Sequence, residues 1–337
     1  MRIASISHFG ALWKRYPVNV LDLEEKGSLV VGGGETAFLR TAAGLAALGH
    51  TVETWHCGDA GVWRGVNFHS IDEPLYPQLV SEPWDVVIGW SGLRALEYAP
   101  PGAKRLFAQQ LNDLSNIGDW SCVDAIVSPS RNHTEYMEQW GWKKDFAVVH
   151  NGVDLELYSD APKWEDRPFN VGYWSSPDRG LHHLLRAWPH VVAEEPRAKL
   201  HVFYEIKRYL DMLSKYPVNF YGERGQQVAR LILDNISNPS VVFHGSIPRR
   251  ALSKIQKQCR VMCYPFETFS YTEGFSTATA EALAAGCLVI ETPRDALPSL
   301  YEGAVHWVDI DFMDFEYPKR LAKDIVNGLR GELNMQG

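Results

Sequence analysis

The stretch YTEGFSTATAEALAAGCLVIETP, residues 271–293, joins a Gly/Ser/Thr-rich turn to an alanine-rich helix and then to a hydrophobic strand. The order turn, helix, strand is typical of a parallel α/β fold. Two glutamates stand out, Glu273 in the turn and Glu281 inside the predicted helix. The side chain of Ser276 or Thr277 can cap that helix by accepting a hydrogen bond from a backbone N–H of its first turn.

The start of this helix is a candidate anion site, because unpaired N–H groups and the helix dipole favour a negative charge there. Glu281 lies five residues past Ser276, which is about 7.5 Å along the helix axis. An anion at the helix start would therefore have a carboxylate on each side. Carboxylates accept hydrogen bonds from sugar hydroxyls, and a nucleotide sugar offers hydroxyls, phosphates and hydroxyls in that order. An incidental glutamate on a surface helix has the same spacing, so spacing alone leaves both interpretations open.

The rest of the chain repeats the alternation of strand and helix. Short β-branched segments predict strands at 2–7, 51–55, 85–90, 105–110, 125–130, 146–153, 169–175, 198–204, 240–246, 260–266 and 287–293. Helical patterns cover 34–50, 131–141, 179–195, 249–259 and 277–286. A last helix at about 317–334 has Leu321, Ile325 and Leu329 on one stripe. This alternation predicts parallel sheets covered by helices, an α/β fold.

The length predicts two domains, since 337 residues exceed one ordinary core. The polar segment YSDAPKWEDRP, residues 158–168, interrupts the alternation of strand and helix. We therefore expect an N-terminal domain at 1–160 and a C-terminal domain at 161–337, each with an αβα architecture. Two such domains bind ligands in a cleft, at the carboxyl ends of their strands.

The composition excludes several classes of protein. Hydrophobic residues make up 45% and charged residues 22%, as in a globular protein, and the net charge of −8 disfavours a general nucleic-acid binder. No apolar run approaches the ~18–20 residues of a membrane span, and MRIASISHFG lacks the apolar core of a signal peptide. The cysteines are odd in number and form no CxxC pair, so we expect free thiols in a reducing cytoplasm. They are Cys57, Cys122, Cys259, Cys263 and Cys287.

Glu273, seven intervening residues and Glu281, followed by ALAAGCLVI, resemble the motif of retaining glycosyltransferases with the GT-B fold, family 4 in particular. Other segments resemble that family in the family's own order, namely 32–55, 127–137, 148–158, 171–188 and 241–252. The resemblance covers most of the chain. It implies two Rossmann-like αβα domains that face each other across a cleft, the C-terminal one binding the nucleotide sugar.

The resemblance also implies roles for residues of the C-terminal domain. Glu281 would bind the ribose hydroxyls of the donor, and Glu273 would serve catalysis by binding the ring hydroxyls of the donor sugar. The backbone that meets the sugar and the pyrophosphate would be that of Gly274, Phe275 and Ser276. Arg179, in SSPDRG, would be catalytic by neutralising the leaving pyrophosphate.

In the N-terminal domain, Gly33 and Gly34 would let the backbone approach the diphosphate. The family usually has a second basic residue shortly after the VG of the strand at 169–175, but here Tyr173 and Trp174 follow Gly172. Either Arg179 carries the phosphate charge alone, or a more distant basic residue helps. The candidates for that help are Lys207 and Arg208.

The acceptor side departs from the family as well. The family's active-site histidine normally follows the strand matched by RLFAQQ, but this chain has AQQLND there. Gln110, Asn112 or Asp113 would take its place, and Asp113 is the candidate that would orient or deprotonate the acceptor. The segment NDLSN also has a turn composition in which Asp113 would only be a cap. His8, at the end of the first strand, is a further candidate, either facing the cleft or structural.

The implied activity is transfer of a hexose from a nucleotide diphosphate sugar with retention, by front-face attack in which the leaving phosphate takes the acceptor proton. A UDP-sugar is the favoured donor, with GDP- and ADP-sugars as alternatives. We expect no cofactor and no metal ligands, because no DxD-type site is evident. The acceptor stays open among glycans, small molecules and modified nucleic acid.

Three other functions fit parts of the sequence. Gly32, Gly34 and Ala37 satisfy G-x-G-x-x-A, with Glu53 about twenty residues on, as in an NAD(P)-dependent oxidoreductase; however, these glycines do not directly follow the first strand. The missing histidine also suits a catalytically inactive nucleotide- or carbohydrate-binding module. A glycosyltransferase that acts on modified DNA bases would need a local basic groove. Such a groove could form from Arg249, Arg250 and Lys254.

Overall fold

The computed structural model describes residues 1–7, 33–56, 58, 60–70, 81–90, 92–110, 119–139, 141, 145–215, 222–268, 270–308 and 314–333. The chain divides into two compact units, Met1–Gly152 and Val153–Gly337. Three expected acceptor-side residues, His8, Asn112 and Asp113, lie outside the described residues.

The described part of the N-terminal unit contains an eight-stranded sheet in the order β3-β4-β2-β1-β5-β6-β7-β8. All neighbouring strands are parallel except β3 and β4. The strands are β1 (Arg2–Ile6), β2 (Thr51–His56), β3 (Gly61–Trp63), β4 (Val66–Ser70), β5 (Val86–Gly89), β6 (Lys104–Ala108), β7 (Ala125–Ser128) and β8 (Phe146–Val148). The helices are α2 (Gly33–Ala47), α4 (Arg94–Glu97) and α5 (Arg131–Glu138).

Helices cover both faces of this sheet, so its central strands are apolar on both sides. On β1, Ile3 belongs to the same buried cluster as Phe38 of α2. Ala4 and Ile6 belong to a second cluster, together with Leu96 of α4. Successive side chains of a strand point to opposite faces. The near-continuous hydrophobic runs in the sequence are therefore those of a buried parallel sheet.

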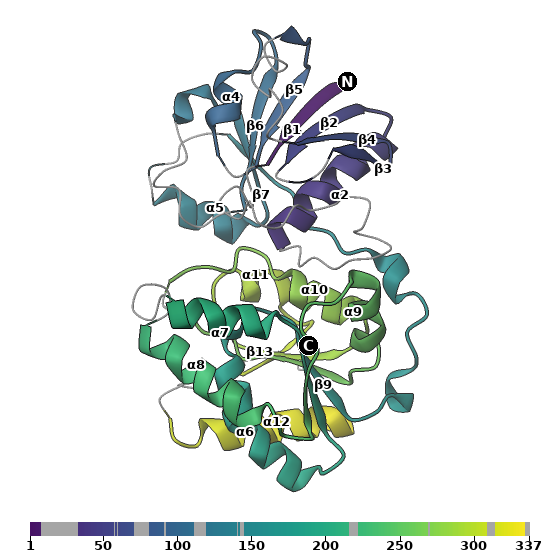
Figure 1. Cartoon of the computed structure of the whole chain (residues 1–337), viewed down its shortest axis with the longest axis vertical. Coiled ribbons are helices and arrows are strands. Elements are labelled where there is room, and N and C mark those ends of the chain that lie inside the picture. Colours follow the sequence, from purple (N-terminus) through teal and green to yellow (C-terminus); the bar gives the residue numbers. More distant parts are fainter. Residues whose placement is uncertain are drawn as a thin grey trace. The chain divides into compact units, whose positions relative to one another are not determined.

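The described part of the C-terminal unit contains a six-stranded parallel sheet in the order β11-β10-β9-β12-β13-β14. The strands are β9 (Asn170–Tyr173), β10 (Lys199–Val202), β11 (Val241–Phe243), β12 (Val261–Tyr264), β13 (Leu288–Glu291) and β14 (His306–Trp307). The helices are α6 (Leu181–Glu194), α7 (Ile206–Lys215), α8 (Gly222–Asn235), α9 (Arg249–Gln256), α10 (Thr277–Ala284), α11 (Leu297–Tyr301) and α12 (Tyr317–Arg330). In Figure 1 this sheet lies between a layer with α10 and α11 and a layer with α6 and α12.

The apolar stripe of the last helix is confirmed. Leu321, Ile325 and Leu329 of α12 are all buried, and α12 packs along α6. The helix ends at Arg330, where Gly331 adopts a left-handed conformation with φ of 75°. The helix therefore ends a few residues before the expected end at about residue 334, because the glycine stops it.

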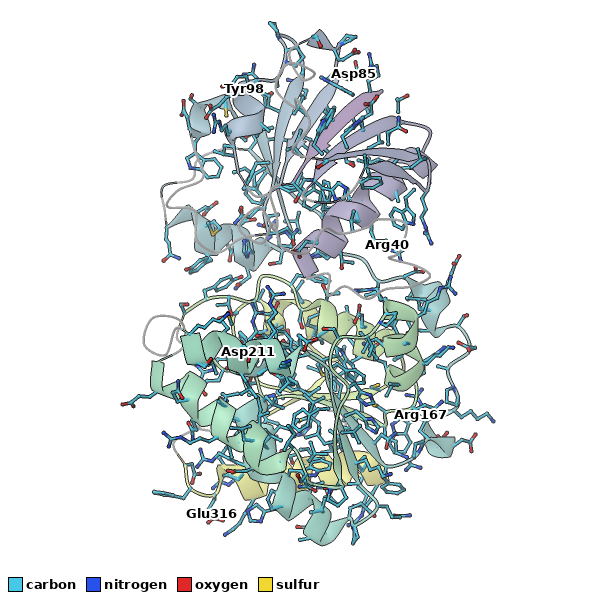
Figure 2. All side chains as sticks on the ribbon, in the orientation of Figure 1. Arg40, Asp85, Tyr98, Arg167, Asp211 and Glu316 are labelled. Carbon is cyan, nitrogen blue, oxygen red and sulfur yellow. The ribbon has the colours of Figure 1, made fainter. Side chains whose placement is uncertain are left out.

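The polar segment 158–168 has specific partners in the C-terminal unit. Tyr158 is buried in the C-terminal unit and donates a hydrogen bond to Gln256. Arg167, labelled in Figure 2, donates hydrogen bonds to the carbonyl oxygens of Pro162, Cys259 and Gly286. These side chains attach segment 158–168 to the C-terminal unit, within which it lies.

Several elements were not predicted from the sequence. The hairpin of β3 and β4 turns at Arg64 and Gly65, which both have positive φ, and it adds an antiparallel edge to the sheet. Positive φ at both turn residues gives the backbone a twist that matches the right-handed twist of the two flanking strands. The helices α7 and α8 and the short α4, α11 and β14 were also missed, although the buried Ile206, Tyr209 and Leu213 of α7 have helical spacing.

Gly180 determines where the loop before α6 can lie. Its φ of 114° is in the left-handed region, and a Cβ there would be 2.1 Å from the carbonyl oxygen of Pro265. Glycine is therefore required for this loop, the 3₁₀ turn η5 (Pro177–Arg179), to approach the segment after β12.

We expect Gly180→Ala to lower the free energy of unfolding by about 2–4 kcal/mol, because the left-handed φ and the clash with the Pro265 backbone add together. Denaturant unfolding followed by tryptophan fluorescence measures the loss. Gly303→Ala is the matched control, since φ there is 74° but nothing lies within 4 Å of the added Cβ. Equal losses in the two variants would contradict a specific role for the contact with Pro265.

Candidate functional site

The candidate site is built around the start of α10. Ser276 is the N-cap, and its hydroxyl accepts a hydrogen bond from the backbone N–H of Thr279. The hydroxyl of Tyr301 donates to the carbonyl oxygen of Ser276 at 2.8 Å. The expected cap is confirmed, and the turn in front of the helix has a fixed path.

Glu273 lies in that turn, with its side chain only 10% exposed. Arg179 donates to its Oε2 from Nη1 at 2.8 Å, and the hydroxyl of Tyr264 donates to the same oxygen at 3.0 Å. The backbone N–H groups of Thr272 and Glu273 donate to Oδ2 of Asp295. The side chain and the backbone of Glu273 are thus held by separate partners.

Burial and charge act in opposite directions on this pair. Burial raises the pKa of the Glu273 carboxyl, and the Arg179 guanidinium opposes that rise. Burial by itself lowers the pKa of Arg179, but Glu273, Tyr264 and Asp178 together outweigh it and raise that pKa above its ordinary value. The two groups therefore stabilise each other as ions.

Glu281 is also buried, and both of its oxygens have protein partners. Arg249 donates from Nη2 to Oε1, and Gln256 donates from Nε2 to Oε2 at 3.1 Å. Gln256 in turn accepts the hydrogen bond from Tyr158. The nearby charge of Glu281 adds to burial in raising the pKa of Tyr158. Each carboxylate oxygen has two lone pairs, so acceptor capacity remains for a ligand.

A third glutamate, Glu291, lies at the end of β13 and is fully buried. The hydroxyl of Thr279 donates to its Oε1 at 2.8 Å. Burial raises its pKa well above the ordinary value, so the neutral carboxyl is favoured. Glu291 supports the first turn of α10 through its contact with Thr279.

An aromatic wall adjoins the start of α10. Trp174 donates from its indole N–H to the carbonyl oxygen of Ala278 at 2.9 Å. Phe203 packs edge-on against Trp174, and the His244 ring stacks on Phe203 with centroids 4.5 Å apart. Nδ1 of His201 lies 2.9 Å from Nε2 of His244. The position where the family has a basic residue thus belongs to a packed cluster, while Lys207 and Arg208 are exposed on α7.

In the N-terminal unit, the described candidates lie on separate elements. Gly33 and Gly34 are the first residues of α2. Gln110, just after β6, exchanges two hydrogen bonds with Asn151 through the side-chain amides. Its buried neighbour Gln109 lies 3.2 Å from Nε2 of His133. The Gln110 amide therefore has a fixed orientation.

Sequence reasoning missed the residues that hold Glu273, namely Tyr264, Asp295 and Ser175, whose hydroxyl donates to Tyr264. Asp295 has φ of 53°, and its segment TPRDALPS has a turn composition that could have suggested a structural carboxylate. Tyr264 has no sequence signal, because nothing distinguishes it from the other tyrosines of a chain that has 14.

The arrangement can bind an anion between two carboxylates. The capped helix start supplies backbone N–H groups, and Arg179 supplies a cation beside it. Glu273 and Glu281 supply hydrogen-bond acceptors for hydroxyl groups. No helix among the described residues is long and apolar enough to cross a membrane.

Comparisons with known proteins identify the type of domain and the fold. Residues 168–327 match the family model described as Glycosyl transferases group 1. No curated protein sequence matches at a significant level. Residues 168–327 lie within the C-terminal unit, which carries Arg179, Glu273 and Glu281.

Solved structures resemble nearly the whole chain. The sucrose-phosphate synthase of Thermosynechococcus elongatus has 16% identity and a TM-score of 0.63, with 99% of this chain and 95% of that chain covered. A glycosyltransferase involved in avilamycin A biosynthesis has 16% identity and a TM-score of 0.62, covering 99% and 93%. HepE of Anabaena, solved with UDP and glucose, has 14% identity and a TM-score of 0.59, covering 99% and 96%. The expected GT-B fold is confirmed.

A buried histidine in the aromatic wall predicts how the stability of the fold depends on pH. Burial, and secondarily His244, lowers the pKa of His201 to about 4, against about 6.5 in an unfolded chain. The unfolded state then binds more protons between these values, so stability falls as the pH is lowered from 7 to 5. We expect His201 to account for about 1–2 kcal/mol of that loss.

Urea unfolding of wild type and His201→Gln at pH 7 and 5 tests this, and the variant should lose less stability than wild type. His190→Gln, at an exposed position on α6, is the control. If His201→Gln loses as much stability as wild type, His201 is not the titrating group.

Proposed function

We propose that this glycosyltransferase, whose residues 168–327 form a glycosyl transferases group 1 domain, transfers a hexose from a nucleotide diphosphate sugar to an acceptor with retention at the anomeric carbon. One observation carries the proposal. The capped start of α10 has Glu273 on the preceding turn, held by Arg179, and Glu281 within the helix. In the proposed complex, Glu273 would bind the sugar, the start of α10 the diphosphate, and Glu281 the ribose.

The diphosphate would bind at the start of α10. Its charge would be neutralised by Arg179 and by backbone N–H groups around Gly274, Phe275 and Ser276. Arg179 is suited to this role because its side chain is 31% exposed although it pairs with Glu273. Charge neutralisation by these groups supports transfer without a metal ion.

Glu273 would bind the ring hydroxyls of the donor sugar. Both recorded side-chain contacts use Oε2, and none of the described residues donates to Oε1. Oε1 is therefore the acceptor that a sugar hydroxyl would use. Arg179 and Tyr264 fix the carboxylate in advance, which lowers the entropy cost of binding.

Glu281 would bind the ribose hydroxyls while it stays in contact with Gln256. The ribose would either share the carboxylate with Arg249 or displace that side chain, which is 27% exposed and so has room to move. Because Arg249 pairs with Glu281, the structure does not favour a DNA-binding groove of Arg249, Arg250 and Lys254.

In the N-terminal unit, Gly33 and Gly34 stay candidates for the diphosphate and Gln110 for the acceptor side, together with His8, Asn112 and Asp113. The donor is a UDP-sugar in our proposal, with GDP- and ADP-sugars as alternatives. HepE of Anabaena was solved with UDP and glucose, and the pneumococcal O-GlcNAc transferase GtfA with UDP and GlcNAc. The free, buried thiols of Cys259, Cys263 and Cys287 support a reducing, cytoplasmic location.

The first test is ligand binding. A ligand that binds only the folded chain raises its melting temperature, so UDP and UDP-sugars should do so, and NAD(P) should not. Glu281→Gln should weaken binding of UDP and of UDP-sugar alike by about 1.5–3 kcal/mol, the range for hydrogen bonds to a charged group. Calorimetric titration measures the change.

The matched control is Glu302→Gln, at an exposed position of the same unit. Because Glu281 is buried, circular dichroism must show that the variant is folded at the assay temperature. Unchanged UDP affinity in folded Glu281→Gln would reject the ribose assignment, and absence of any shift with UDP-, GDP- or ADP-sugars would reject the proposed donor class.

Glu273→Gln should behave differently. It leaves UDP affinity equal or higher, because Arg179 loses its competing carboxylate, and it lowers kcat since the sugar is held less well in the transition state. Donor turnover at saturating UDP-sugar, with UDP affinity measured in parallel, separates the two effects. A variant that loses UDP affinity but keeps kcat would show that the roles of Glu273 and Glu281 are reversed.

A further inference from the structure

Two histidines and a glutamate outside the proposed donor site converge in the C-terminal unit. His182 and His183 are consecutive, buried residues in the first turn of α6, and Glu267 follows β12. Nε2 of His183 lies 2.6 Å from Oε2 of Glu267, and Nε2 of His182 lies 3.4 Å from the same oxygen. One ligand atom from each residue lies within 4.8 Å of the others.

The convergence of the two rings is unusual for neighbours on a helix. Consecutive residues of an α-helix point about 100° apart, yet the ring centroids of His182 and His183 are only 3.9 Å apart and both Nε2 atoms approach one carboxylate. The ring of Tyr317 packs edge-on against His183, with centroids 5.2 Å apart. Packing therefore holds two imidazoles against Glu267 in a pocket whose other wall is aromatic.

We infer that His182, His183 and Glu267 bind a divalent transition-metal ion, with zinc(II) as the best fit. Zinc takes imidazole nitrogen and carboxylate oxygen at about 2.0–2.2 Å, which places tetrahedral ligands about 3.4 Å apart. The separation of His182 and Glu267 already has that value, and His183 would need to move only by about 0.8 Å. Magnesium and calcium prefer all-oxygen sites, so the two imidazoles disfavour them.

The site also has access to solvent. The side chain of Glu267 is 26% exposed, whereas the two imidazoles are 4% exposed. Water can therefore occupy the fourth position, and the ion can enter from the Glu267 side. The ion would take the place of any proton on Nε2 of the imidazoles, so binding would replace the hydrogen bond between His183 and Glu267 by bonds to the ion.

Such an ion would join the start of α6 to the segment after β12. These are the two segments that Gly180 allows to approach and that Arg179 and Glu273 also connect. The ion would therefore act as a structural clamp beside the proposed donor site. It would raise stability, and the transfer reaction proposed above needs no chemistry from it.

The test uses the tag-free chain, stripped of metal with a chelator and titrated with Zn²⁺ by calorimetry without any donor. We expect one equivalent to bind, the melting temperature to rise with Zn²⁺, and EDTA to reverse that rise. His183→Ala and Glu267→Gln should each lower the affinity by about tenfold or more. His190→Ala removes an exposed histidine from the same helix and should leave the affinity unchanged.

Replacement of Zn²⁺ by Co²⁺ in the wild-type chain gives an independent readout if a variant fails to fold, since a four-coordinate site gives visible d–d absorption. Binding that depends on His183 and Glu267, or a four-coordinate Co²⁺ spectrum that Zn²⁺ displaces, supports the site. No binding by wild type, or equal affinity in all variants, overturns it. Neither result depends on UDP-sugar binding, so this proposal and the proposed function can fail separately.

Discussion

The ion pair between Arg179 and Glu273 is the constraint on which the candidate site depends. A carboxylate as buried as that of Glu273 is costly to keep ionised, and removing one member of a fully buried pair costs about 3–5 kcal/mol. The partial exposure of Arg179 reduces that figure here. The charge that would neutralise a diphosphate is therefore the same charge that keeps Glu273 ionised. In the proposed function, fold stability and donor binding would therefore depend on the same pair of residues, whose geometry is supported by Gly180 and Tyr264.

Glu281 illustrates the same principle with a different partner. Its carboxylate is oriented by Gln256, which is itself fixed by Tyr158, and it is neutralised by Arg249. A carboxylate with a fixed orientation would lose little conformational freedom if a ribose bound as proposed, because that cost is already met during folding. The pairing also explains why Arg249 is better understood as a partner of the site than as part of a basic surface.

The departure from the family pattern at Tyr173 and Trp174 has a packing explanation. The ring of Trp174 occupies the space beside Gly172, where a Cβ would be 2.1 Å from it. Its indole N–H binds the carbonyl oxygen of Ala278 in α10, and its ring continues into Phe203 and His244. At the position where the family usually has a second basic residue, this chain therefore has an aromatic ring that supports α10. Arg179 is the basic residue that lies next to Glu273.

The sequence by itself determined the α/β alternation, the stripe of α12, the Ser276 cap and the placement of Glu273 and Glu281 before and after one helix start. These features depend on periodicity and capping, which act over a few residues. Only the tertiary structure decided which side chains meet. Arg179 and Glu273 are 94 positions apart, and His183 and Glu267 are 84 apart. They meet because β9 and β12 are neighbours in the sheet, so the loops after these parallel strands emerge side by side at one edge. Strand order is set by the packing of the whole sheet, and no local pattern encodes it.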